Sequence, residues 1–529
     1  MRSYPSRARA VGAAALVAAC LSACSGGSGD DAPSQKYVNG ATFTLAATSD
    51  PGSLDPQAGA GSSLIQLNAF AYDALVSLGA KGDIQPQLAS SWTVDGTSAT
   101  FTIKSGVTCA DGTAFTAQTV ADNITYVEDP ANKSPLLGAF IPAGATATAS
   151  GSTVQLKLAQ PAPFLLSSLS NLPMVCPKGM RDRASLKGAT DGTGPYTLSQ
   201  ASPGDQYVYT VRKDYTWGPG GASTAADGTP AKIVVKVIQN ETTAANQLLA
   251  GQINAAQIVG TDRTRLSAAG VASSSTPLLL GQQWYNHAAG HVTSDPQVRL
   301  ALTEALDLAQ LQKVLTSNTG GPATQLAVLP PAGCQGDSVQ GNVPATDVDG
   351  AKAKLAAAGW TPGSDGILTK DGKKLSLTML YDSALGTGAS AAAELAASQW
   401  KAIGVEVTAT SQPTAAMQGA MFGTGAWDVA WEALNVNTPD QLLAFLSGLA
   451  APNGTNFAAI DNAAYTAAAT KAAAQVGAAG CADWLAAEAA LFKAADVVPF
   501  ANSLLPTFFK GATLEQAGTI APTSIKMLG

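Results

Sequence analysis

The sequence predicts an α/β protein with several lobes, and two observations support this fold class. Segments in which apolar and polar residues alternate, as in half-buried strands, are interspersed with helical patterns along the whole chain of 529 residues. Between about residues 375 and 407, a strand, an Ala-rich helix and a second strand follow one another, which is the order of a parallel α/β unit. A chain of this length is enough for about three domains.

The expected strands lie where residues of one polarity recur at every second position. In chain order they cover residues 43–46, 99–103, 153–158, 207–211, 233–238, 375–379 and 405–407. The turn-rich Asp50-Pro51-Gly52-Ser53 follows the first of them, and a helix over about 390–403 separates the last two.

Three further helices are expected from apolar residues that recur on one face. The first covers about 296–306, and the second covers 347–358 and is ended by Gly359 in the position of a C-terminal cap. The third is amphipathic and covers about 484–492. Pro499 is expected to stop this helix before a short final strand.

The N-terminus has the layout of a secretory signal over residues 1–23. Three arginines precede an uncharged run over 11–23, which is too short to span a bilayer permanently. Leu21-Ser22-Ala23-Cys24 resembles a bacterial lipobox, which implies that Cys24 carries lipid and that residues 24–37 form a flexible tether. The expected location is the outer face of the cytoplasmic membrane. Cys20 in a weaker second lipobox, or an ordinary cleaved signal, are the alternatives.

The charge and hydropathy of the remaining chain exclude two classes of partner. Removal of residues 1–23 leaves 27 Lys and Arg against 37 Asp and Glu, a net charge of −10. No basic cluster remains, so we expect no nucleic-acid partner. No later segment has about 18 uninterrupted apolar residues, so we expect no further membrane span.

Four cysteines remain beyond Cys20 and Cys24, namely Cys109, Cys176, Cys334 and Cys481. None lies in a CxxC pair, and their wide spacing suits neither zinc nor a redox dithiol. An even number of thiols outside the cytoplasm favours disulfides, although buried free thiols are the alternative. Four cysteines permit three pairings, and the most economical one keeps each bridge within one domain: Cys109–Cys176 and Cys334–Cys481.

The sequence argues against an enzyme and against a resident metal or other cofactor. A Ser–His hydrolase would need His287 or His291 as its base, and neither accompanies a G-x-S-x-G elbow. No Walker A loop or dinucleotide fingerprint is visible. The two histidines are four residues apart, but Gln282-Gln283-Trp284 and Ala289-Gly290 indicate strand and loop, where that spacing does not make a metal site.

The chain resembles the peptide/nickel class of extracytoplasmic solute-binding proteins, which deliver ligands to ABC importers. The motifs that carry the resemblance occur in family order over about residues 42–510. They are Ser53-Leu54-Asp55-Pro56, Tyr72-Asp73-Ala74-Leu75-Val76, the stretch 82–92, Phe101-Thr102-Ile103 with Asp111-Gly112-Thr113, Gly192-Thr193-Gly194-Pro195-Tyr196, Asp295-Pro296 to Arg299 with Ala305-Leu306-Asp307, Ala357-Ala358-Gly359-Trp360 and Asp371-Gly372-Lys373.

The resemblance implies a two-lobed periplasmic-binding-protein fold (class II, cluster C) with a subdomain inserted in lobe I. Lobe I is expected to comprise 38–75, 190–280 and 490–529, with the inserted subdomain over 76–189 and lobe II over 281–489. Crossovers near 281 and 489 would form the hinge. This division places Cys109 and Cys176 in the inserted subdomain, and Cys334 and Cys481 in lobe II.

The resemblance also implies the function. The protein is expected to be a monomer that captures a solute between its lobes and passes it to the membrane permease, without catalysis. A peptide or peptide-like solute is the main expectation, a metal chelate or an oligosaccharide is the alternative, and a secreted hydrolase is a remote one. Family position gives the candidate ligand contacts Gly61, Ser62, Trp284, Tyr285, Asn286, Trp431, Glu432 and Asn435. Trp431 is equally well explained as a core aromatic, and Asp428 is better explained as a structural acid.

One departure from the family pattern bears on the ligand. Peptide carriers of this family often place an Asp in the loop before "DP", where it pairs with the α-ammonium group of the peptide. In this chain Leu434 or Asn435 stands at that place, and a neutral amide lacks the charge-assisted contact. Glu432 could substitute if the register shifts. The pattern therefore argues against peptides with a free amino terminus and leaves room for modified peptides or other solutes.

Overall fold

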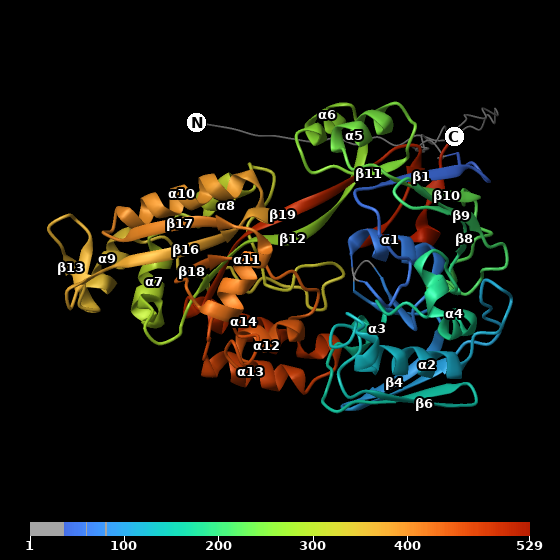
Figure 1. Ribbon diagram of the computed structural model, residues 1–529, viewed down its shortest axis with the longest axis horizontal. Coiled ribbons are helices and arrows are strands. Elements are labelled where there is room, and N and C mark those ends of the chain that lie inside the picture. The colour runs from blue at the N-terminus through green and yellow to red at the C-terminus, as the bar shows by residue number, and fades with distance from the viewer. Residues whose placement is uncertain (1–35, 60, 80–81) are drawn as a thin grey trace, which may run out of the picture. The chain divides into compact units, whose positions relative to one another are not determined.

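A ten-stranded mixed sheet runs through the chain in the computed structural model, which describes residues 36–59, 61–79 and 82–529 (Figure 1). The signal segment with Cys20, and most of the expected tether with Cys24, lie outside the described residues. In order across the sheet, the strands are β17 (Glu406–Gln412), β16 (Ser376–Asp382), β18 (Val429–Trp431), β12 (Ala272–Tyr285), β19 (Val497–Phe509), β11 (Ala255–Gln257), β1 (Thr42–Ala47), β10 (Lys232–Val237), β9 (Gln206–Val211) and β8 (Tyr196–Ser202).

The long strands β12 and β19 lie side by side in the middle of this sheet and join its two groups of strands (Figure 1). They pair in antiparallel fashion from Ala272 opposite Phe509 to Trp284 opposite Val497. The register shifts at Gly281, where a Cβ atom would lie 2.6 Å from the Phe500 ring. Only glycine allows the two strands to approach this closely.

The end of the chain differs from the expectation that Pro499 stops a helix before a short strand. Helix α14 (Cys481–Lys493) ends earlier, and Ala495 has a left-handed φ of 50°. Pro499 lies inside β19, a strand with a total length of 13 residues. The strand tolerates this proline because it lies beside the register shift, where Gln282 pairs with Pro499 and Gly281 with Ala501.

The parallel α/β unit expected from the sequence is confirmed. Strand β16 pairs in parallel with β17 on one side and β18 on the other, and α10 (Thr387–Lys401) connects β16 to β17. Leu377 and Met379 of β16 and Trp400 of α10 are buried in the same core. The helices expected at about 296–306 and 347–358 appear as α7 (Pro296–Glu304) and α9 (Val348–Ala357), and α8 (Leu308–Leu315) is a further helix that was not expected.

On the other side of β19, β1 pairs in parallel with β10 and with β11, and β10, β9 and β8 form antiparallel hairpins. The strands expected at 43–46, 207–211 and 233–238 are thereby confirmed. The helices of this part are α1 (Ser62–Ala71), α5 (Glu241–Leu249) and α6 (Asp262–Ala268). Phe43, Phe70 and Tyr209 lie in the core between α1 and the sheet.

A second, four-stranded antiparallel sheet has its own core. Its strands, in order, are β4 (Ala89–Asp95), β5 (Ser98–Ile103), β7 (Thr153–Lys157) and β6 (Thr146–Ser150), and α2 (Ala117–Glu128) packs on it. The strands expected at 99–103 and 153–158 are therefore confirmed. Tyr215 and Trp217 join this core from outside the range 76–189 that the sequence assigns to the inserted subdomain.

Two disulfides cross-link the part of the chain that the structure describes, and they are the two that the economical pairing favoured. Cys109 is bonded to Cys176, and Cys334 is bonded to Cys481. The remaining helices are α3 (Leu165–Leu169), α4 (Pro177–Arg181), α11 (Thr414–Gly419), α12 (Leu443–Leu446) and α13 (Ala463–Ala473). The short strands are β2 (Val76–Leu78), β3 (Ile84–Pro86), β13 (Thr361–Pro362), β14 (Leu368–Lys370), β15 (Lys373–Lys374), β20 (Ala512–Thr513), β21 (Gln516–Ala517), β22 (Thr519–Ile520) and β23 (Lys526–Met527). No helix in the described ranges has the length and hydropathy needed to cross a bilayer.

Candidate functional site

A cavity of about 250 Å³ lies against one face of α1. Ile65, Asn68, Ala69 and Tyr72 form that face, because residues three and four apart lie together on a helix. The other walls come from residues 73–78 and 136–140, from 170–173 and 517–523, and from scattered prolines that include Pro331. Segments far apart in sequence therefore meet around one hollow.

The floor of the cavity includes Asp73, which is 2% exposed and fully hydrogen-bonded. Its Oδ1 accepts from Gln87 Nε2 at 2.7 Å and from Tyr215 Oη at 2.9 Å. Its Oδ2 accepts from Thr193 Oγ1 at 2.8 Å and from Trp217 Nε1 at 3.0 Å. Burial raises the pKa of Asp73, and these four donors oppose the rise. Asp73 therefore holds four segments together and has no lone pair directed at a ligand.

The Gly-Thr-Gly-Pro-Tyr motif packs against the same cluster so closely that it needs its glycines. A Cβ atom at Gly194 would lie 2.4 Å from the carbonyl carbon of Ala71, at the end of α1. A hydrogen bond from Gly194 N–H to the Ala71 carbonyl at 2.9 Å holds the two segments together. The Gly-Thr-Gly-Pro-Tyr motif and the Tyr-Asp-Ala-Leu-Val motif therefore pack against each other beside the cavity.

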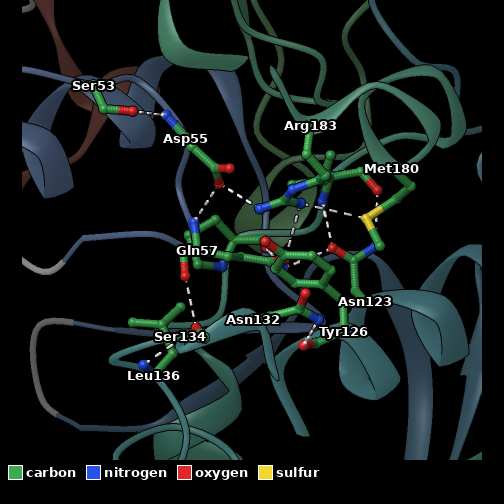
Figure 2. Close-up of polar contacts among 12 residues, drawn as sticks. Ser53, Asp55, Gln57, Asn123, Tyr126, Asn132, Ser134, Leu136, Met180 and Arg183 are labelled. Carbon is green, nitrogen blue, oxygen red and sulfur yellow. Dashed lines mark hydrogen bonds and ion pairs between the residues drawn. The ribbon is translucent and has the colours of Figure 1, made fainter. Parts of the chain in front are cut away.

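A second polar cluster fixes the segment before α1 (Figure 2). Asp55 forms an ion pair with Arg183, whose guanidinium lies 3.9 Å from the centre of the Tyr126 ring. Asp55 Oδ1 also accepts from the backbone N–H of Gln57 at 3.0 Å, and Gln57 Nε2 donates to Asn123 Oδ1 at 2.7 Å. This network ties the Ser-Leu-Asp-Pro motif to α2 and to residue 183, so the entry into α1 is held in place.

The first two candidate ligand contacts lie at that entry. Gly61 is the N-cap residue of α1 and Ser62 is its first residue, and both are exposed. Neither lines the cavity, whose α1 face begins with Ile65. The structure therefore places Gly61 and Ser62 on an accessible surface next to the cavity.

The candidate contacts at the end of β12 are buried and have partners within the protein. Trp284 is 0% exposed, donates to the Glu432 carbonyl at 2.8 Å and packs against Phe457 with 4.7 Å between ring centroids. The hydroxyl of Tyr285 lies 2.7 Å from Gln283 Nε2 and 3.0 Å from Thr303 Oγ1. These aromatics support the sheet from within and do not face an open surface.

Asn286 and Trp431 are buried in the same manner. Asn286 Nδ2 donates to the Trp427 carbonyl at 2.9 Å, and Trp431 Nε1 donates to Gln283 Oε1 at 3.0 Å. Trp431 packs against Phe500 of β19, with 5.2 Å between ring centroids. The sequence left open whether Trp431 is a core residue or a ligand contact. Its buried position is that of a core residue.

Glu432 and Asp382 form a pair of carboxyl groups at one edge of the sheet. They follow neighbouring residues of the parallel strands β18 and β16, where Trp431 is in register with Tyr381. Burial raises the pKa of Glu432 to about 7, and the negative charge of Asp382 and a hydrogen bond with it add to the rise. At neutral pH such a pair can share a proton or face a cation.

The two histidines lie apart from this pair. His291 Nδ1 lies 2.9 Å from Asp428 Oδ1, and Asp428 Oδ2 accepts from Thr378 N–H at 2.8 Å, so Asp428 has two structural contacts. His287 Nε2 lies 3.8 Å from Asp496, and burial lowers the pKa of His287 to about 3. In the described part of the chain, no group of three or more His, Cys, Asp or Glu side chains is arranged to hold a metal ion.

A family model for the bacterial extracellular solute-binding proteins, family 5 Middle, matches residues 83–456. The chain belongs to this family. The match covers most of both strand groups and includes β12, which links them.

Relatives of the family 5 protein bind different solutes according to their names. The periplasmic murein peptide-binding protein MppA of Escherichia coli (strain K12) is 26% identical over 505 residues, covering 89% of this chain and 90% of MppA. The nickel-binding periplasmic protein of the same strain is 27% identical over 417 residues, covering 74% of this chain and 75% of that protein.

Solved structures agree on the fold, which is that of two-lobed periplasmic binding proteins. The unliganded open form of MppA superposes with a TM-score of 0.77 at 22% identity, covering 94% of this chain and 99% of MppA. A substrate-binding protein from Microbacterium hydrocarbonoxydans, complexed with 4-hydroxybenzoate hydrazide, gives a TM-score of 0.66 at 25% identity, covering 92% and 100% of the two chains.

Sequence reasoning missed the residues that line the cavity of this family 5 protein. Ile65, Asn68, Ala69 and Tyr72 recur at helical spacing, so a search for one helix face directly after the Ser-Leu-Asp-Pro motif could have found them. Pro331 lies in an irregular loop, and no local pattern indicates that it reaches the cavity.

Proposed function

We propose that this chain is the solute-binding component of an ABC importer and that it carries a peptide or peptide-like solute. The feature that supports this most is the pair β12 and β19, which links two groups of strands within one sheet. A two-strand link of this kind suits hinge closure of two lobes around a ligand, with crossovers near residue 281 and before Val497. The similarity to MppA over 89% of the chain supports a peptide-like solute.

A metal chelate is the second candidate, and the similarity to the nickel-binding periplasmic protein favours it. His287 and His291 have separate carboxylate neighbours, Asp496 and Asp428. A metal would therefore arrive already held by an organic chelator, and the protein would recognise the complex.

The contacts that we propose for the solute are at the entry of α1 and at the carboxyl pair. Gly61 and Ser62 offer accessible backbone to a bound main chain, in the manner of an added strand. Glu432 with Asp382 takes the place of the acid that is missing at Leu434 and Asn435, and would receive a cationic group of the solute.

Native mass spectrometry of protein purified from its own host tests the proposal. We expect a bound solute that is released on denaturation and is identified as a peptide-like molecule. Small-angle scattering should then show a more closed particle when that solute is added back to protein refolded without it. Recovery of no solute, one unchanged particle shape, or chemical conversion of the added solute would contradict the proposal.

We further propose that Cys24 anchors the protein to the outer face of the cytoplasmic membrane. The acyl chains of a lipidated cysteine bury methylene groups at roughly 0.8 kcal/mol each, and two or more chains anchor stably. A Cys24→Ala variant should leave the membrane fraction, whereas Cys20→Ala should stay in it. Retention of Cys24→Ala in washed membranes would refute the anchor.

A further inference from the structure

Asn68 places an unpartnered carboxamide on the wall of the cavity beside α1. The residue is 5% exposed, and its side chain forms no hydrogen bond with any described residue. Its backbone carbonyl, by contrast, accepts from Tyr72 N–H at 2.9 Å as the helix requires. Nearly all buried polar side chains in proteins have a hydrogen-bond partner. The carboxamide faces the cavity and is available to pair with water or with a polar group of a solute that enters it.

The walls of the cavity carry no charge that is free to pair with a ligand. No Lys, Arg or His is among the described lining residues. The one lining carboxylate, Asp73, already accepts from four donors. The Tyr72 hydroxyl accepts from Asp191 N–H at 3.1 Å, and the Tyr215 hydroxyl donates to Asp73. A charged group in this cavity would lose its hydration without gaining a counter-charge.

The rest of the lining is uncharged and mostly apolar, with polar groups from Ser77, Gln87, Ser170, Asn171, Thr519 and Thr523, and it suits one side chain. Ile65 is 39% exposed and lies on the same helix face as Asn68. Phe140 and several prolines complete the walls. A volume of about 250 Å³ is just below the roughly 300–1,000 Å³ of typical small-molecule sites. The cavity therefore fits one substituent of a solute better than a whole solute.

Pro331 connects this cavity to the other group of strands. It lies in the loop before Cys334, which is bonded to Cys481 at the start of α14. Gln325 Nε2 donates to the Ala327 carbonyl at 2.6 Å and to the Cys334 carbonyl at 2.9 Å, which fixes the shape of the loop. A substituent in the cavity would touch this loop, so its binding would favour the arrangement in which Pro331 covers the cavity.

We infer that the cavity beside α1 is a pocket for an uncharged, largely apolar substituent of the solute, and that Asn68 is one of its hydrogen-bonding groups. The inference rests on the proposed function and names the chemical class that this part of the site selects. It applies equally to a peptide side chain and to an organic group of a chelator.

Three matched probes test the charge preference: N-acetyl-phenylalaninamide, N-acetyl-lysinamide and N-acetyl-glutamate amide. Each is titrated into the refolded, solute-free full chain by isothermal calorimetry or ligand-observed NMR. We expect the neutral aromatic probe to bind at least about tenfold more tightly than either charged probe. Equal binding of the three probes, or no binding of the neutral one, would overturn the inference.

Two variants locate the binding. Asn68→Leu keeps the branching and the number of side-chain heavy atoms and removes the hydrogen-bonding groups, so we expect about tenfold weaker binding of the neutral probe with an unchanged or higher melting temperature. Ala69→Phe fills the cavity and should abolish binding. The matched control is Asn246→Leu on the exposed face of α5, which should bind as wild type does.

The outcomes distinguish the pocket from the function. If both cavity variants bind the neutral probe as wild type does, the pocket assignment is wrong. If the solute recovered from the host still binds them with unchanged affinity, the proposed function stands and only the pocket fails. If Ala69→Phe does not fold, Asn68→Leu decides the question alone, because its expected stability is at least that of wild type.

Discussion

The side chain of Asn435 pairs with both backbone groups of Leu279. Its Oδ1 accepts from Leu279 N–H at 2.8 Å, and its Nδ2 donates to the Leu279 carbonyl at 2.9 Å. The carboxamide thus imitates the pairing of a neighbouring strand at the point where β12 loses its regular register with β19. Because both ends of the carboxamide are paired with Leu279, the main role of Asn435 is to stabilise the sheet.

Replacement of Asn435 by Asp should therefore destabilise the fold. The carboxylate keeps the acceptor for Leu279 N–H but faces the Leu279 carbonyl without a proton to donate. We expect a loss of about 1–3 kcal/mol in the free energy of unfolding at pH 7, measured by urea denaturation. Asn437→Asp in the same loop is the control, and it should stay within about 0.5 kcal/mol of wild type. Unchanged stability with altered solute affinity would instead make Asn435 a ligand contact.

Variants of Trp431 test whether this residue stabilises the core or contacts the solute. Trp431→Ala should lose about 3–5 kcal/mol in unfolding free energy, because the indole packs on Phe500 in a closed core. Trp431→Phe retains most of the packing and loses the bond to Gln283 Oε1, so the loss should be about 1–3 kcal/mol. Calorimetry on the folded fraction should give the same solute affinity for all three proteins. A lower affinity of Trp431→Phe at unchanged stability would show that the indole contacts solute.

Local pattern predicted the regular elements of this fold well. The strands at 43–46, 99–103 and 153–158 alternate in polarity because one face of each is buried, and that alternation is visible in sequence. Pro499 misled the prediction because a proline usually ends an element. Its place beside a register shift in β19 depends on the pairing with β12, which is more than two hundred residues away in sequence.

The candidate site was less predictable, for a similar reason. A tryptophan suits a protein core as well as a ligand cleft, so the sequence does not distinguish the two for Trp284 and Trp431. Only the packing against Phe457 and Phe500 shows that they are core residues. The cavity is built from segments that meet only in the folded chain, so neither Asn68 nor Pro331 has a local signature. Family position named Gly61 and Ser62, which lie at the start of the same helix, and their contact with a solute stays a prediction.

The bridge between Cys334 and Cys481 should contribute substantially to stability. The two cysteines are 147 residues apart in sequence, and a cross-link over so long a loop removes much entropy from the unfolded chain. The double variant Cys334→Ser/Cys481→Ser should lose about 2–4 kcal/mol in unfolding free energy. Reduction of the wild-type protein should lower its stability further, because Cys109–Cys176 is then also lost. An unaffected double variant would show that the loop is held by its other contacts.

Glu488 should make stability depend on pH between about 4.5 and 7. The residue is 4% exposed, and its Oε2 accepts from Ser338 Oγ at 2.5 Å and from Leu326 N–H at 3.2 Å. Burial raises the pKa of Glu488 from 4.5 to about 7, and these hydrogen bonds oppose the rise. The folded protein thus binds the proton more tightly than the unfolded chain does. The resulting stabilisation is fully present below pH 4.5 and is lost as the pH rises through 7.

The comparison with Glu488→Gln isolates this effect from the other titrating groups. Glutamine imitates the protonated acid, so the variant should resemble wild type at pH 4.5. It should exceed wild type at pH 8 by an amount on the order of 3 kcal/mol, since one pKa unit corresponds to about 1.4 kcal/mol. Glu515→Gln, at an exposed carboxyl, should follow the wild-type curve throughout. A constant difference between Glu488→Gln and wild type from pH 4.5 to pH 8 would mean that Glu488 is ionised in the folded protein over that whole range, and that its buried carboxylate is compensated by Ser338 and Leu326 alone.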